Sequence, residues 1–149
     1  MRFLVTGGAG FIGSAFIRLV LQTDRSAEVV NLDSLTYAGN LENLASISGD
    51  PRYRFIRGDV CNKTLVHDVV EQTQPDVLVH FAAESHVDRS ILSPEPVFET
   101  NLRGSLTLLE AARLHRTPRF LHVSTDEVYG SIQPPHEADE NYPLRASSP

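Results

Sequence analysis

The chain has 149 residues, of which 41% are hydrophobic and 21% charged, a composition typical of a single globular domain. Its 13 Lys+Arg and 19 Asp+Glu give a formal net charge of −6, which argues against a nucleic-acid partner because such partners need a basic surface. The one cysteine, Cys61, excludes an intramolecular disulfide and favours a reducing, cytoplasmic location. The apolar run at residues 3–5 is too short for a signal peptide or a membrane span, so no membrane partner is expected.

Short apolar runs alternate with amphipathic stretches along the chain. Strands are predicted at residues 3–5, 29–32, 53–56, 77–81 and 120–123. The first helix has its apolar positions at Ile12, Phe16, Leu19 and Val20, and the helix after the third strand has them at Leu65, Val66, Val69 and Val70. The longest helix is predicted over residues 96–115. We expect its apolar stripe to be Phe98, Leu102, Leu106 and Leu109, and its solvent-facing residues to be Glu99, Arg103, Glu110 and Arg113.

Strands that are apolar throughout and separated by helices are typical of a parallel sheet covered on both faces. The predicted fold class is therefore α/β, a Rossmann-like doubly wound sheet with strand order 3-2-1-4-5. Residues 1–130 are expected to form a dinucleotide-binding domain. Residues 131–149, which are rich in proline and lack periodicity, are expected to form an irregular active-site loop. We expect this loop to lead into a substrate domain that the 149 residues do not include.

A glycine-rich turn follows the first strand and opens the first helix. Gly8, Gly10 and Gly13 fit the pattern GxGxxG, and Gly7, Gly10 and Gly13 fit GxxGxxG. Asp33 ends the second strand 20 residues after the last glycine, as the dinucleotide-binding fingerprint requires. A carboxylate there can accept hydrogen bonds from ribose hydroxyls and would repel a 2′-phosphate, so the sequence predicts NAD rather than NADP. The alternatives are a glycine turn that only packs a helix and an Asp33 that caps the following turn; the second is compatible with binding.

Five stretches resemble one family, the extended short-chain dehydrogenase/reductases, and within it the dTDP-glucose 4,6-dehydratases. These stretches are TGGAGFIG from Thr6, DSLTYAGNL from Asp33, AAESHVDRS from Ala82, ETN from Glu99 and STDEVYG from Ser124. The last is the most specific, because epimerases and decarboxylases of the same superfamily generally lack its adjacent Asp-Glu pair.

The resemblance implies a role for each matching residue. Phe11 and Ile12 would contact the pyrophosphate of NAD, and Asp33, Ser34, Leu35 and Thr36 would surround the adenosine ribose. Asp59 and Val60 would flank the adenine, while Phe81, Ala82, Ala83, Ser85 and Thr100 would lie near the nicotinamide half. Ser85 and Thr125 would also touch the hexose of the nucleotide-sugar substrate. In the catalytic triplet Thr125, Asp126 and Glu127, Asp126 would be the proton donor and Glu127 the proton acceptor.

The implied reaction needs these groups for a chemical reason. Oxidation of C4 to a ketone makes the C5 proton acidic, so that Glu127 could remove it while Asp126 protonates the departing C6 hydroxyl. Returning the hydride to C6 gives a 4-keto-6-deoxy sugar and restores NAD. Since neighbouring strand residues point to opposite sides, both carboxyls can face one substrate only if the chain bends after Ser124.

The sequence departs from the family at one point. No tyrosine is followed four residues later by a lysine, although a Tyr-x-x-x-Lys pair oxidises C4 in this superfamily. We therefore expect the 149 residues to be the amino-terminal part of a dehydratase, inactive alone, with a homodimer for the complete enzyme. A sugar-nucleotide epimerase or decarboxylase and a noncatalytic NAD-binding fragment remain alternatives.

The histidines indicate no metal, because the six of them form no HExxH or HxxxH pair. His80 and His122 are expected to be packed within strands. His86 and Arg89 either shape the sugar pocket or have a purely structural role.

Overall fold

The computed structural model describes residues 1–147, so the last two positions of the predicted loop, Ser148 and Pro149, lie outside the described residues. Five strands form one parallel sheet in the order β3-β2-β1-β4-β5. The strands are β1 (Arg2–Thr6), β2 (Glu28–Asp33), β3 (Tyr53–Arg57), β4 (Val77–His80) and β5 (Arg119–His122). This order confirms the predicted doubly wound α/β fold.

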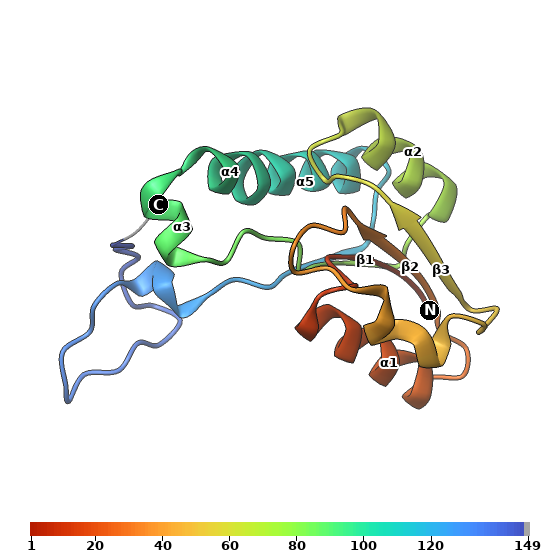
Figure 1. The fold of residues 1–149 in the computed structure, drawn as a ribbon, viewed down its shortest axis with the longest axis horizontal. Helices are drawn as coiled ribbons and strands as arrows, with labels where there is room; N and C mark the ends of the chain where they lie inside the picture. Colours follow the sequence, from red (N-terminus) through yellow and green to blue (C-terminus); the bar gives the residue numbers. More distant parts are fainter. Residues whose placement is uncertain (148–149) are drawn as a thin grey trace.

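Helical segments cover both faces of the sheet. They are α1 (Phe11–Thr23), η1 (Leu41–Ile47), α2 (Lys63–Thr73), α3 (Val87–Leu92), α4 (Glu95–Val97), η2 (Phe98–Gly104), α5 (Ser105–Leu114) and η3 (Asp126–Tyr129). Figure 1 shows α2 and α5 on one side of the sheet and α1 on the other. Each side has its own core. In one, Leu4 and Leu78 of the sheet meet α2 and Leu108 of α5; in the other, Val5, Val29 and Val79 meet α1.

The long helical run differs from its prediction in shape and orientation. Residues Glu95–Val97 and Ser105–Leu114 are α-helical, but Phe98–Gly104 between them is a π-helix. The predicted apolar stripe was wrong: Phe98, Leu102, Leu106 and Leu109 are all about half exposed or more. The buried residues of this run are small or medium in size instead, namely Gly104, Thr107, Leu108, Ala111 and Ala112.

The predicted apolar positions of the first helix are half correct. Phe16 and Val20 pack against the core beside the buried Ile17 and Leu21, whereas Ile12 and Leu19 are largely exposed. In both helices the residues that face the sheet include small ones, because a helix that packs closely on a sheet has room only for short side chains at the nearest points. Within the described residues, no helix is long and apolar enough to cross a bilayer.

The sheet brings three connecting segments together at one edge. Thr6 at the end of β1 is paired with Leu32 of β2 and His80 of β4. The segments that follow these strands therefore leave the sheet side by side, at the point where the strand order reverses. Ligands of doubly wound sheets bind at this position.

Candidate functional site

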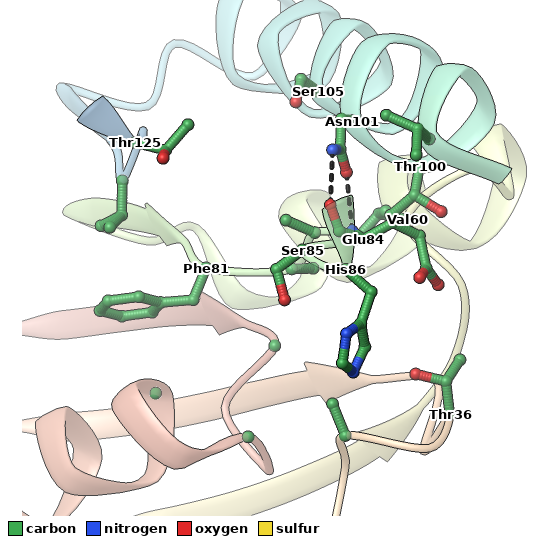
Figure 2. A pocket seen from close by; sticks show the side chains of 18 of the residues that line it. Thr36, Val60, Phe81, Glu84, Ser85, His86, Thr100, Asn101, Ser105 and Thr125 are labelled. Carbon is green, nitrogen blue, oxygen red and sulfur yellow. Dashed lines mark hydrogen bonds between the residues drawn. The ribbon is translucent and has the colours of Figure 1, made fainter. Parts of the chain in front are cut away.

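A cavity of about 840 Å³ lies at the carboxyl ends of the strands. It is lined by most of the residues that the sequence singled out: Gly7, Gly10, Phe11, Ile12, Gly13, Asp33, Ser34, Thr36, Asp59, Val60, Phe81, Ala82, Ala83, Ser85, Thr100, Thr125 and Glu127. Of the predicted site residues, Leu35 and Asp126 are not part of this lining. Figure 2 shows how residues from separate loops and from the long helical run surround the cavity.

Two glycines of the turn, Gly7 and Gly13, have no room for a side chain. Gly7 has φ +70, and a Cβ there would lie 2.6 Å from the Ala82 backbone nitrogen. A Cβ on Gly13 would lie 2.3 Å from the Gly7 carbonyl oxygen. The turn therefore packs against the end of β4 on one side and against the first turn of α1 on the other.

The amino-terminal end of α1 opens into the cavity. Its cap residue Gly10 has no side chain to bond the helix, and the Ser14 N–H bonds to the Gly10 carbonyl. The N–H groups of Phe11, Ile12 and Gly13 come before that bond and have no intrahelical acceptor. Free N–H groups at the positive end of a helix dipole are suited to a diphosphate.

Asp33 is a buried carboxylate at the end of β2, only 7% exposed. One oxygen accepts a hydrogen bond from the Ala9 N–H and the other from the Leu35 N–H, each at 2.8 Å. Asp33 thus holds the glycine turn and also caps the turn that follows β2, which was one of the alternatives considered from the sequence. Each carboxylate oxygen keeps a second lone pair, so the group that lines the cavity can still accept from ribose hydroxyls.

The segment after β4 is fixed by a side chain whose role was not predicted. The Asn101 amide accepts from the Glu84 N–H at 2.8 Å and donates to the Glu84 carbonyl at 2.9 Å. These are the two dashed contacts in Figure 2. The stretch Glu99–Asn101 resembles the family in sequence, but a contact between positions 17 residues apart leaves no local signal.

His80 joins three elements beneath the cavity and is packed within its strand, as predicted. The same prediction for His122 was wrong, because His122 is exposed and lines the cavity. The Nδ1 of His80 lies 2.7 Å from the Thr6 hydroxyl and its Nε2 lies 2.9 Å from the Ser105 hydroxyl. Burial, with a smaller contribution from the nearby His122, lowers the pKa of His80 to about 4. The imidazole is therefore neutral near pH 7 and holds the end of β1 against the start of α5.

The predicted catalytic triplet lies where the chain bends after β5. Thr125 is extended and Asp126 starts the short helix η3, which supplies the bend that the sequence analysis required. The Thr125 hydroxyl accepts from the Glu127 N–H at 3.2 Å and lies 3.3 Å from Asp126 Oδ1. Glu127 and Thr125 face the cavity, whereas Asp126 lies outside its lining.

Two other features bear on possible chemistry. Burial raises the pKa of the Cys61 thiol to about 11, so this cysteine is not a nucleophile near neutral pH. Within residues 1–147, no three His, Cys, Asp or Glu side chains gather closely enough to hold a metal ion.

Comparisons with known proteins point to one family. The family model described as GDP-mannose 4,6 dehydratase matches residues 4–149. A dTDP-glucose 4,6-dehydratase of Streptomyces niveus is 53% identical over 153 residues, which cover 100% of this chain and 45% of that protein. A second, from Shigella flexneri, is 49% identical and covers 97% of this chain and 42% of its own length.

Solved structures show the same fold. The dTDP-glucose 4,6-dehydratase DesIV of Streptomyces venezuelae, with NAD and TYD bound, has a TM-score of 0.93 and 50% identity over 99% of this chain and 46% of its own. The UDP-glucose 4-epimerase of Thermus thermophilus in complex with NAD has a TM-score of 0.87 and 37% identity over 99% of this chain and 45% of its own. The chain thus spans less than half the length of the relatives that it matches.

Proposed function

The chain belongs to the family described as GDP-mannose 4,6 dehydratase, and from this membership we propose that it carries the NAD-binding and acid–base residues of a dTDP-glucose 4,6-dehydratase. Such an enzyme is a lyase of deoxysugar biosynthesis. The observation that carries the proposal is that Asp33 and Glu127, from opposite ends of the sequence, line one cavity. The glycine turn, the open end of α1 and the Asp33 carboxylate fit a diphosphate joined to a ribose.

NAD, when bound, would accept a hydride from C4 of the hexose and return it to C6. Glu127 would remove the C5 proton, which the C4 ketone makes acidic. Asp126 would protonate the C6 hydroxyl as it leaves as water, after a rotation that turns its side chain into the cavity. Ser85 and Thr125 would orient the hexose, while Phe81, Ala82, Ala83 and Thr100 would flank the nicotinamide. Asp59 and Val60 would flank the adenine.

Oxidation at C4 also needs a base, which these residues do not include. The single lysine, Lys63, pairs with Glu110 at 2.9 Å on the outside of α2 and is not part of the cavity lining. We therefore expect residues 1–149 to bind NAD but not to turn over substrate by themselves. We further propose that the complete enzyme is a cytoplasmic homodimer, which is consistent with a free thiol at Cys61 and with the exposed apolar side chains of η2 and α5.

Calorimetry and a product assay test the proposal together. NAD should bind the chain at least about tenfold more tightly than NADP, because the Asp33 carboxylate repels a 2′-phosphate. Asp33→Asn should narrow this preference, whereas Asp24→Asn, at an exposed turn, should leave it unchanged. Incubation with NAD and dTDP-glucose should give no 4-keto product; equal binding of both dinucleotides, or repeated turnover, would contradict the proposal.

The sibling activities are separated by Glu127. The NAD-bound epimerase shares the fold, so the fold alone does not distinguish the two reactions. In a complete enzyme that contains these residues, Glu127→Gln should abolish exchange of the C5 hydrogen with solvent and retain oxidation at C4. Unchanged exchange at C5 would favour an epimerase or decarboxylase, and failure to oxidise C4 in the parent enzyme would favour a noncatalytic NAD-binding module.

A further inference from the structure

A group of side chains joins two walls of the cavity at its rim. Tyr37 belongs to the segment between β2 and η1, and its partners Glu84, His86 and Arg89 belong to the segment after β4 and to α3. The Tyr37 hydroxyl donates to Glu84 Oε2 at 3.2 Å. The Tyr37 and His86 rings lie with 5.4 Å between their centroids and are tilted by 40°, and the Arg89 guanidinium carbon lies 4.6 Å from the Tyr37 ring centroid. One tyrosine thus has three kinds of contact with the opposite wall.

The two segments that these contacts join both line the cavity. Thr36, Ala38 and Gly39, which flank Tyr37, line one wall. Glu84, Ser85 and His86 line the other. Figure 2 shows the His86 ring directed from its own segment toward the segment that carries Thr36. Tyr37 itself is 50% exposed and lies outside the cavity lining, between residues that belong to it.

Both walls are anchored independently of the Tyr37 contacts. On one side, Asn101 holds the Glu84 backbone with its two hydrogen bonds. On the other, the Gly39 N–H bonds to the Thr36 carbonyl and the Asn40 N–H bonds to the Ala9 carbonyl. Both backbones therefore have anchors of their own, and the rim is bridged by the side chain of Tyr37 with those of Glu84, His86 and Arg89.

We propose that Tyr37, held by Glu84 and Arg89, retains the dinucleotide in the cavity throughout the reaction cycle. This inference rests on the proposed function. In that cycle the hydride removed at C4 is returned to the same sugar, so a reduced dinucleotide that left between the two transfers would end the cycle with an unfinished product. A bridge over the rim slows departure without touching the reacting atoms, which makes Tyr37 a positioning residue and not a catalytic one.

The test measures how fast NADH leaves the chain. NADH is bound to the chain, an excess of NAD is added in a stopped-flow instrument, and the loss of bound-NADH fluorescence gives the release rate. Tyr37→Ala and Arg89→Met should each speed release by about tenfold or more, with association rates within about twofold of the parent chain. Tyr37→Phe, which keeps the ring but loses the hydroxyl, should fall between the parent and Tyr37→Ala.

Controls separate a bridging role from a general disturbance. Glu84→Ala should speed release, and Glu84→Gln should restore slow release because its amide oxygen still accepts from the tyrosine. Tyr142→Phe and Arg116→Met remove the same groups away from the cavity and should release NADH at the parent rate. Thermal unfolding without dinucleotide should be the same for Tyr37→Phe and the parent chain, since the ring is retained.

The possible outcomes test this inference separately from the proposed function on which it rests. If the parent chain binds NADH and the Tyr37, Glu84 and Arg89 variants release it at the parent rate, the bridge is refuted and the proposed function stands. The same holds if the variants change association alone. If the parent chain does not bind NADH or NAD at all, both proposals are overturned.

Discussion

At the scale of single residues, a side chain on Gly13 would collide with the backbone of the glycine turn. A Cβ there would lie 2.3 Å from the Gly7 carbonyl oxygen and 2.8 Å from the Gly8 Cα, and both are backbone atoms that cannot move without the turn. Gly13→Ala should therefore lower the free energy of unfolding by about 1–3 kcal/mol and weaken NAD binding on the order of tenfold or more. Urea denaturation and calorimetry measure the two effects.

Gly49 provides the matched control, because a Cβ there would meet no atom within 4 Å. Gly49→Ala should leave NAD binding unchanged and should stabilise the chain by about 0.4–1 kcal/mol, since alanine reduces the freedom of the unfolded chain. A Gly13→Ala chain with parent-like stability and affinity would show that the turn can relax, contrary to the packing described.

His80 links single-residue chemistry to pH. Burial lowers its pKa to about 4, whereas the unfolded chain has the ordinary value of 6.5. Between these values the unfolded chain binds a proton that the folded chain does not. The stability that neutral His80 gives the fold is therefore fully present above pH 6.5 and is lost as the pH falls toward 4. The loss from this group amounts to about 3 kcal/mol.

Comparison with His80→Gln isolates this effect from the carboxyl groups that titrate in the same range. At pH 7.5 the variant should be less stable, because at least one of the hydrogen bonds to Thr6 and Ser105 is lost. The difference in unfolding free energy between the two chains should shrink as the pH falls to 5. A difference that stays constant over that range would mean that His80 is not held neutral by the fold.

At the scale of elements, the strands and the glycine turn could be predicted because their signals are local. A strand buried on both faces is apolar at every position, and the spacing from Gly13 to Asp33 follows from one helix and one strand. The long helix could not be oriented in this way. Its bulky residues Leu102, Leu106 and Leu109 suggested a buried stripe. The positions that pack closely are instead small: Ala111 lies in the core and Gly104 lies against Val60.

The π-helical segment explains part of the remaining difference. A π-turn has one more residue than an α-turn, which changes the angular position of everything that follows and which periodicity at 3.6 residues does not detect. The π-helical segment also contributes to the site, because Thr100, Asn101 and Leu102 of η2 line the cavity. The hydrogen bonds of Asn101 to Glu84 and the contacts of Tyr37 join segments that are distant in the sequence. Neither could therefore be predicted from the spacing of residues along the chain.

At the scale of the whole molecule, one helical run carries several of the exposed apolar side chains. Phe98, Leu102, Leu106 and Leu109 are 55%, 64%, 55% and 49% exposed. Phe98 and Leu102 also line the cavity, which leaves Leu106 and Leu109 of α5 as the exposed apolar pair outside it. Figure 1 shows α5 on the same side of the sheet as α2. An apolar helix face of this kind is typical of an interface with another protein surface, and the proposed homodimer would bury it against the same face of a second copy.

Two-fold symmetry makes that proposal testable with one substitution. In a symmetric dimer each residue contributes twice, and burying a leucine side chain is worth about 1.5–3 kcal/mol. Leu106→Lys should therefore weaken the dimer by roughly a hundredfold or more. Leu19→Lys alters a leucine that is 57% exposed on α1, on the opposite side of the sheet, and should leave the dimer intact.

Light scattering over a concentration series measures the association of both variants. A parent chain that is monomeric at high micromolar concentration, or a Leu19→Lys chain that dissociates as Leu106→Lys does, would refute association through η2 and α5.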